Sequence, residues 1–318
     1  MKMKKAGTAL AVLFLFAANM AVAEDWPVKP ITLQLGYSAG GSSDIMCRIL
    51  AKALGEELGQ PVTVINKPGA GGWICWNDMF TNAPTDGHTF YLVNTPYINM
   101  GFYDPANPRK WKHTDADLLI NQVVDYSIMA IRADEERFTD FPSFLEYAKN
   151  NPIMSAASAV GVLSDDFTCM QKLMNAHGIE IDVVQTSGAK ETETYFLSGD
   201  SDVMFANIGD VRPAHEGGEY KAVVVFAPVR SELLPDVPTY KELGYGELIE
   251  YSARGYAYPK GVADPVRAKM IAALEKAILA VKPQMDTLGA ETVVLKGDEY
   301  VKFLDEDVVT GKAAYNIK

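Results

Sequence analysis

The residues from Gly36 to Gly40 read Gly-Tyr-Ser-Ala-Gly and lie between a predicted strand and a predicted helix. A serine flanked by two glycines at this spacing is the nucleophile motif of α/β-hydrolases, so one interpretation is a secreted serine hydrolase that uses Ser38. That chemistry also needs an oxyanion-binding loop after an earlier strand, and only residues 24–35 precede the motif in the expected mature chain. No clear aspartate-then-histidine pair follows it. We therefore expect no catalytic residues here and keep the hydrolase as the alternative.

The same glycine-rich turn has a second interpretation that needs no catalysis. It is followed by Ser42 and by apolar residues at helical spacing as far as Leu58, so it opens a predicted helix. Backbone N–H groups at the start of a helix point outward and can bind an anion. A tight turn without a ligand explains the glycines equally well. The turn is thus a candidate anion site.

Arg254 is the only formal charge in the segment from Tyr251 to Tyr258. A guanidinium in such surroundings can bind a carboxylate through two parallel hydrogen bonds. It can also form a structural salt bridge with an aspartate from another part of the fold. The sequence leaves both interpretations open.

No motif for a nucleotide or a metal ion is evident. The segment from Lys67 to Gly72 is rich in glycine but matches neither G-x-G-x-x-G nor a Walker motif, so we predict a structural loop. The cysteines Cys47, Cys75 and Cys169 lack a C-x-x-C spacing, and H-E-x-x-H is absent. We therefore expect no metal and no cofactor. Export would permit a disulfide between Cys47 and Cys75, and buried free thiols are the alternative.

The composition indicates an ordinary globular protein. The 318 residues are 48% hydrophobic and 22% charged, which excludes a disordered, collagenous or coiled-coil chain and allows two domains. The formal net charge is −12. Such an acidic chain lacks the basic face that phosphate backbones require, so we expect no nucleic-acid partner.

The first 23 residues have the features of a secretory signal peptide. A basic start at Met1–Lys5 is followed by an apolar run at Ala9–Ala18 and by the A-x-A site Ala21–Ala23. We expect cleavage after Ala23 and a soluble periplasmic product. Removal of three lysines from the 29 basic residues leaves 26 against 41 acidic ones, a net charge near −15.

Beyond this leader, strands and amphipathic helices alternate in two series, which predicts parallel sheets covered by helices on both faces. The first series comprises strands at 31–35, 62–65 and 88–93 and a helix at 42–58. The second comprises helices at 141–149, 164–176 and 190–197 and strands at 153–157, 181–184, 202–205 and 222–226. From about residue 264 we expect a helix, a strand at 292–295 and a closing helix.

The two series predict two α/β lobes, each a mostly parallel sheet flanked by helices. No linker rich in glycine and serine separates them, so we expect crossing strands at 127–132 and 252–258. The expected division places residues 24–132 and 252–318 in the first lobe and residues 133–251 in the second.

The chain resembles the extracytoplasmic substrate-binding proteins of tripartite tricarboxylate transporters, also called the Bug family. Short motifs in the expected order carry the resemblance: Lys29–Ile31, Ala39–Asp44 with Arg48, Gly59–Val62, Asn66–Gly72, Asp86–Thr89, Gly199–Phe205 with Asn207, and Leu234–Thr239. Arg254–Tyr256, Pro259–Gly261 and Ile131–Asp134 look more like the tricarboxylate-binding branch.

The resemblance implies a two-lobed Venus-flytrap fold that captures a small organic acid, a di- or tricarboxylate, and delivers it to a membrane permease. We expect a monomer. In such proteins a first glycine loop, here Tyr37, Ser38, Gly40, Gly41 and Ser42, holds the ligand carboxylate. A second loop from the other lobe, here Val160 and Gly161 up to Ser164, closes over it, and Thr95, Gly188 and Asn207 fall at positions that line the cleft. Asp165 and Asp166 either accept hydrogen bonds from the ligand or cap a helix.

The sequence departs from the family pattern at some positions, and its charge opposes its expected ligand. Gly36 stands where proline is frequent, and Ala206 replaces a common aspartate, which leaves the ligand undetermined. A protein near −15 repels anions at long range. Capture must therefore depend on local N–H groups and on Arg254, since salt screens charges beyond about 8 Å.

Overall fold

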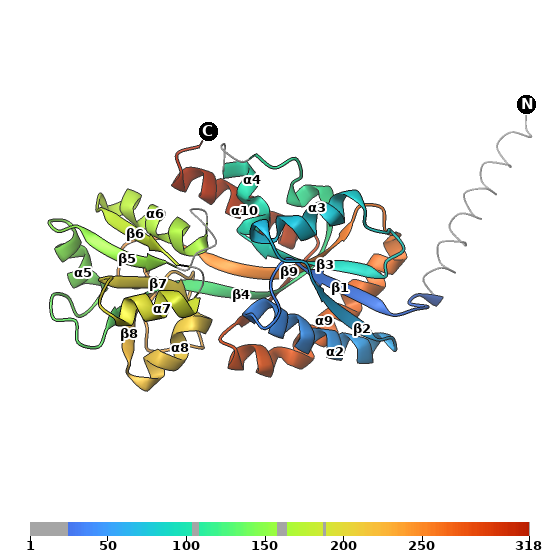
Figure 1. Cartoon of the computed structure of the whole chain (residues 1–318), viewed down its shortest axis with the longest axis horizontal. Coiled ribbons are helices and arrows are strands. Elements are labelled where there is room, and N and C mark those ends of the chain that lie inside the picture. The colour runs from blue at the N-terminus through green and yellow to red at the C-terminus, as the bar shows by residue number, and fades with distance from the viewer. Residues whose placement is uncertain (1–24, 104–107, 158–163, 187–188, 318) are drawn as a thin grey trace, which may run out of the picture.

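The computed structural model describes residues 25–103, 108–157, 164–186 and 189–317. Two α/β lobes lie side by side, and the long strands β4 (Ala116–Arg132) and β9 (Tyr251–Pro259) run between them (Figure 1). The strand order is β2-β1-β3-β9-β4-β7-β5-β6, with β8 and β10 also paired to β4. The expected two-lobed α/β architecture is therefore present.

The first lobe is built around β1 (Ile31–Leu35), which pairs in parallel with β2 (Val62–Asn66) and β3 (Thr89–Thr95). β9 then joins β3 in antiparallel fashion, and β10 (Glu291–Lys296) pairs antiparallel with β4. In the second lobe, β5 (Ile153–Ala157) pairs in parallel with β6 (Ile181–Gln185) and β7 (Val203–Asn207). Parallel pairing is thus confined to the outer strands, and both sheets become mixed where the crossing strands enter.

The strand β4 belongs to both lobes. Up to Tyr126, which faces Tyr251, it pairs with β9. From Ser127, which faces Asn207, it pairs with β7 and with β8 (Tyr220–Val225). Residues 127–132 therefore pair with strands of the second lobe, although our expected division assigns them to the first. That division of the chain stays a prediction.

Helices cover both faces of each sheet (Figure 1). In the first lobe, α2 (Ser42–Leu58) and α9 (Asp264–Thr287) pack on one face, and α3 (Trp73–Thr81) and α10 (Asp298–Ala314) pack on the other. In the second, α5 (Phe141–Ala148) and α6 (Asp165–His177) lie opposite α7 (Ala189–Leu197) and α8 (Ile208–Gly217). The short α4 (Met100–Tyr103) contacts α10. Among the described helices, none has the length and apolar content to cross a bilayer.

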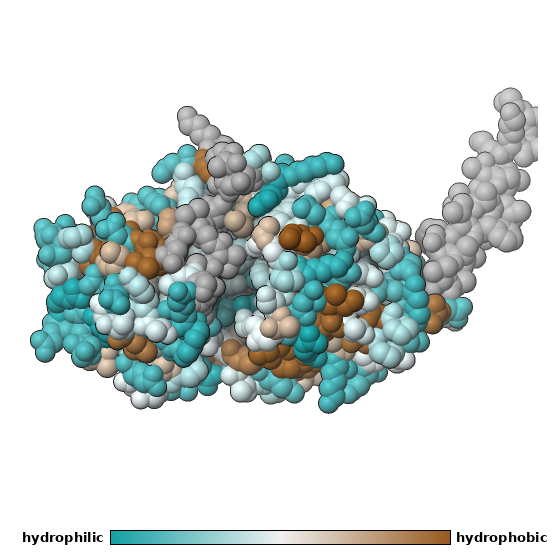
Figure 2. Space-filling model, in the orientation of Figure 1, coloured by the Kyte–Doolittle hydropathy of each residue, from teal (hydrophilic) through white to brown (hydrophobic). Residues whose placement is uncertain are grey.

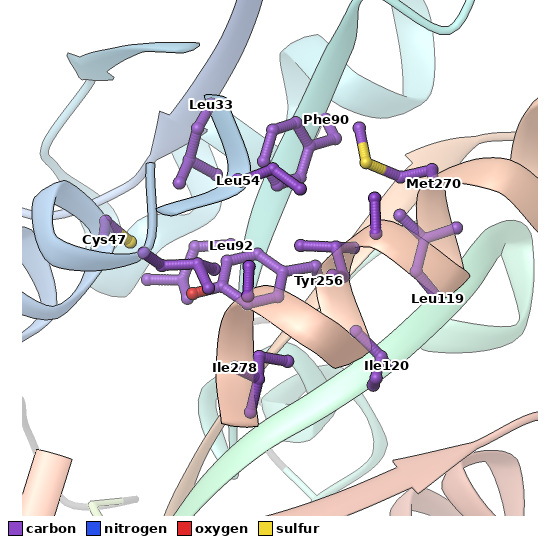
Figure 3. Packing of buried hydrophobic residues seen from close by; sticks show 14 of the residues in the cluster. Leu33, Cys47, Leu54, Phe90, Leu92, Leu119, Ile120, Tyr256, Met270 and Ile278 are labelled. Carbon is purple, nitrogen blue, oxygen red and sulfur yellow. The ribbon is translucent and has the colours of Figure 1, made fainter. Parts of the chain in front are cut away.

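Buried apolar side chains fix the sheet of the first lobe against its helices (Figure 3). Leu33, Phe90 and Tyr256 come from the strands, and Leu54 and Met270 come from α2 and α9. The face of the molecule seen in Figure 2 is mostly hydrophilic, with apolar residues in several separate patches. Burial of this core holds β3 and β9 together, and these strands carry the candidate binding residues described below.

The C-terminal segment connects the two lobes outside the sheet. The Tyr315 hydroxyl lies 2.8 Å from the Thr168 hydroxyl of α6, and the Asn175 amide donates to the Ala314 carbonyl oxygen at 2.9 Å. The half-buried Lys172 of α6 forms an ion pair with the buried Glu250 at 2.7 Å, beside the start of β9. These contacts hold α6 in place, and its first turn projects toward the centre of the molecule.

Candidate functional site

The glycine loop before α2 is exposed but firmly attached to its neighbour. Ser38, Gly40, Gly41 and Ser42 are exposed at the surface. Gly36 approaches Gly72 so closely that an added Cβ would lie 2.4 Å from the Gly72 Cα. This close approach explains a glycine where the family often has proline. It also shows that the segment from Lys67 to Gly72 supports the loop, as we predict for it.

Asp44, in the first turn of α2, bonds one N–H group of this loop. Its carboxylate accepts the Gly40 N–H at 2.8 Å, the Arg48 Nε–H at 3.0 Å and the Asn66 amide at 2.9 Å. The hydrogen bond from Arg48 lowers the pKa of Asp44 to about 2. One of the loop N–H groups that we expect to face an anion is therefore bonded within the protein.

Arg254 lies deeper, on β9 between the lobes, with 8% of its surface exposed. Its Nε–H donates to the Ser43 hydroxyl at 3.1 Å. Its Nη1 lies 3.9 Å from Asp125 Oδ2, which is too long for a hydrogen bond. Nη1 is buried and has no hydrogen-bond partner among the residues that the structure describes. Part of the guanidinium is thus available to a ligand.

Asp125 is the buried acid that faces this guanidinium. It lies on β4, where the chain crosses between the lobes, and its Oδ1 accepts the Gly209 N–H at 3.2 Å. Burial dominates its electrostatics and raises its pKa to about 8, although Arg254 acts in the opposite direction. This carboxyl is therefore mostly protonated at neutral pH.

The second lobe contributes a polar cluster at the first turn of α6. The Asp165 carboxylate accepts hydrogen bonds from the Asn207 amide at 2.8 Å and from the Tyr97 hydroxyl of the first lobe at 3.2 Å. Burial raises the pKa of Asp165. The Asn207 amide also donates to the Asp125 backbone carbonyl oxygen at 3.0 Å, so Asn207 links the Asp165 carboxyl to the β4 backbone.

Tyr37 completes the group from the side of the glycine loop. Its hydroxyl is buried without a hydrogen-bond partner among the described residues. Burial raises its pKa well above the ordinary value, and its hydroxyl interacts electrostatically with both Arg254 and Asp165. A neutral phenol that lacks a partner is a hydrogen-bond donor for a ligand oxygen.

The structure thus brings three of the predicted binding residues, Tyr37, Asn207 and Arg254, into one polar group between the lobes. Thr95 ends β3 and is buried one register step from Arg254, opposite Ala253. Ser164 accepts the Phe167 N–H at the start of α6, so it is a helix cap. Asp166 is buried in the first turn of the same helix. Val160, Gly161 and Gly188 lie outside the described residues.

Sequence reasoning missed Ser43, Tyr97 and Asp125. Each belongs to the group only through a partner distant in the chain: Ser43 through Arg254, Tyr97 through Asp165, and Asp125 through Gly209 and Arg254. Asp125 lies in a run of strand residues and no motif marks it. An isolated acid in an apolar strand is the one signal that could have found it.

The serine of the hydrolase motif has no catalytic surroundings. Hydrogen bonds join the four histidines to other groups: His88 to Asp86, His113 to Asn99 and Asp305, His177 to Tyr240, and His215 to Asp236. Within the described residues none of them is bonded to Ser38.

Cys47, Cys75 and Cys169 are free and buried, so the possible disulfide between Cys47 and Cys75 is absent. No cluster of potential metal ligands occurs among the residues described by the structure.

A cavity of about 590 Å³ lies between α6, α10 and residues 240–249, and it shares no lining residue with the group around Arg254.

Comparison with known proteins identifies the family of this chain. A sequence model described as the tripartite tricarboxylate transporter family receptor, TctC, matches residues 46–315. The chain belongs to this family. A protein from the gbd 5′ region of Cupriavidus necator is 31% identical over 97% of this chain and 94% of that protein. The family resemblance seen in the sequence is thereby confirmed, and the branch within the family is not resolved.

Two solved structures have the same fold. The periplasmic binding protein BugD aligns with a TM-score of 0.73 at 26% identity and covers 92% of this chain and 99% of its own. MatC from Rhodopseudomonas palustris, solved with bound malate, aligns with a TM-score of 0.75 at 22% identity, over 91% of this chain and all of its own (100%). The TctC receptor is thus a non-enzymatic solute-binding protein of a periplasmic transport family, and such receptors act with membrane partners.

Proposed function

We propose that this TctC receptor captures a small di- or tricarboxylate between its lobes and delivers it to the membrane permease of a tripartite tricarboxylate-type transporter. The observation that carries the proposal is the Arg254 guanidinium, which is buried between the lobes with Nη1 lacking a hydrogen-bond partner among the described residues. A ligand carboxylate is the group that best satisfies such a cation.

Electrostatics explain why the ligand should bind at Arg254. A buried cation without close pairing is costly, and its nearest acid is 3.9 Å away and mostly protonated at neutral pH. An incoming carboxylate supplies the missing charge and can accept hydrogen bonds from Nη1 and from the Tyr37 hydroxyl. The net repulsion of an acidic protein acts mainly outside the site, where salt screens it.

The remaining predicted residues belong to the same proposal. In this proposal they would line the cleft around the polar group and shape the space for the rest of the acid, as the family resemblance implies: Ser38, Gly40, Gly41, Ser42, Thr95, Val160, Gly161, Ser164, Asp166, Gly188 and Asn207. We also propose that the protein is cleaved after Ala23, is exported to the periplasm and is a monomer. The intact mass of the exported protein tests the cleavage, because retention of Met1 would contradict it.

A titration tests the charge requirement directly. MatC holds malate, so malate is the first acid to compare with its neutral diamide, and succinate and citrate extend the series. We expect saturable binding of at least one of these acids and no binding of the diamide, because an amide supplies no charge to Arg254. Calorimetry on the mature protein measures both. Equal affinity for acid and diamide, or no binding of any di- or tricarboxylate, would contradict the proposal.

A further inference from the structure

The side chains of Asp125 and Arg254 lie farther apart than the two groups of a directly bonded ion pair. A carboxylate and a guanidinium in direct contact approach to about 2.7–2.9 Å. Here Oδ2 and Nη1 are 3.9 Å apart, although both side chains are buried and come from paired strands, β4 and β9. Asp125 Oδ1 is occupied by the Gly209 N–H. Among the described residues no hydrogen bond reaches Oδ2.

The groups around Asp125 favour its neutral form. Arg254 faces it from β9, Asp210 from the first turn of α8 and Asp165 from the first turn of α6. On β10, Glu291 lies opposite Val124, the neighbour of Asp125, but its carboxylate is bonded to Ser231. Arg254 alone lowers the pKa of Asp125 among these side chains, whereas the two nearby acids and the burial of the carboxyl raise it. Burial is the largest of these influences.

We infer that Asp125 binds the ligand as a neutral hydrogen-bond donor, and that Asp125 and Arg254 hold the same ligand carboxylate. Arg254 Nη1 supplies the charge, and the Asp125 O–H donates a second hydrogen bond to the bound oxygen. An ionised Asp125 could only accept and would repel the ligand. This inference rests on the proposed function and adds a residue that sets its pH dependence.

Binding is then linked to one proton. Below the pKa of Asp125, which is about 8, the carboxyl already carries the proton that the complex needs. Above it, the free protein must take up a proton as the ligand binds. The dissociation constant should therefore rise toward tenfold for each further pH unit. Malate is fully ionised throughout this range, so it does not contribute to the change.

Calorimetric titration with malate at about pH 7 and about pH 9.5 tests the linkage in the mature protein. We expect the wild-type affinity to fall at least tenfold between the two values. Asp125→Asn keeps a donor at every pH, so its affinity should change by less than about threefold between pH 7 and pH 9.5. Asp78→Asn removes a surface acid that pairs with Lys67, and it should keep the wild-type pH dependence.

Either of two calorimetric results would overturn the inference: a wild-type affinity that is equal at both pH values, or a fall in the affinity of Asp125→Asn as steep as that of wild type. Succinate or citrate replaces malate if only that acid binds.

Infrared spectra of the free protein at pH 7 test Asp125 without a ligand. We expect the C=O band of a protonated carboxyl to weaken in Asp125→Asn, and an unchanged band contradicts the inference. Failure of every acid to bind would refute the proposed function, whereas pH-independent binding would refute only this inference.

Discussion

Asp44 and Asp125 are both buried aspartates beside the candidate site, and they differ in their partners. Asp44, with 3% of its surface exposed, accepts hydrogen bonds from Gly40, Arg48 and Asn66, and its pKa is lowered to about 2. Asp125, with 6% exposed, has one backbone donor and a distant cation, and its pKa is raised to about 8. The two acids thus have opposite protonation states at neutral pH, because Asp44 pairs near the surface with the solvent-exposed Arg48, whereas burial is the largest influence on Asp125.

The region around Asp44 has a structural role, whereas the region around Asp125 and Arg254 can still bind a ligand. The network around Asp44 is complete within the protein, so the glycine loop is fixed and one of its N–H groups is already bonded. The pair of Asp125 and Arg254 is incomplete, so a donor and a cation remain for a ligand. The first region should therefore affect stability when it is changed, and the second should affect affinity.

The largest effect is expected from Arg254→Ala. The change removes the cation from the site and should weaken binding of the carboxylate ligand by about 2–5 kcal/mol, the range for truncation of a buried charge pair. Arg254→Lys should recover only part of this loss, because an ammonium cannot reproduce the planar geometry of the guanidinium. Calorimetry measures both variants.

Thermal melts of the same samples without ligand provide the control. A purely structural Arg254 would give an alanine variant that melts earlier but binds normally once folded. Normal affinity in folded Arg254→Ala would remove the distinction between the two regions.

Asp44→Asn should have a smaller effect, on stability. It weakens the charge-assisted hydrogen bonds to Arg48 and Gly40 and should lower the free energy of unfolding by about 1–2 kcal/mol, at the low end of such bonds because Arg48 is solvent-exposed. The pKa of Asp44 is lowered in the folded state, so its contribution is present above about pH 4 and is lost as the pH falls toward 2. Urea unfolding at pH 7 and near pH 2 should show this difference and then its disappearance. A larger loss of ligand affinity than of stability would place Asp44 in the binding region instead.

The smallest effect is expected from Ser38→Ala. Ser38 is exposed on the fixed loop, so loss of its hydroxyl should change the free energy of ligand binding by less than about 0.5 kcal/mol. Calorimetry under the conditions used for Arg254 gives the comparison. A loss comparable to that of Arg254→Ala would make the glycine loop the principal anion site.

Much of the fold follows from local pattern. The bounds of β1, α2 and β5 agree with those predicted from hydrophobic spacing, because a regular pattern of apolar residues marks each of them. The helix α8 was not predicted, since Gly209 and Pro213 interrupt its pattern. The full length of β4 was also missed. Its two halves pair with different lobes, and no local signal reports that.

The candidate site was less accessible to sequence reasoning. Arg254 could be selected because a lone charge in an apolar strand needs an explanation, and Asn207 came from the family resemblance. Asp125 could not, because its role depends on a distance to Arg254 and on a donor 84 residues away, at Gly209. Protonation states in particular follow from burial and from the number of donors, which only the folded chain defines.

A crystal structure of the mature protein with a bound di- or tricarboxylate tests the central claim most directly. We expect one carboxylate of the ligand within hydrogen-bond distance of Arg254 Nη1, with Asp125 Oδ2 and the Tyr37 hydroxyl on the same carboxylate. A ligand held only by the glycine loop, with Arg254 Nη1 still without a partner, would contradict the account.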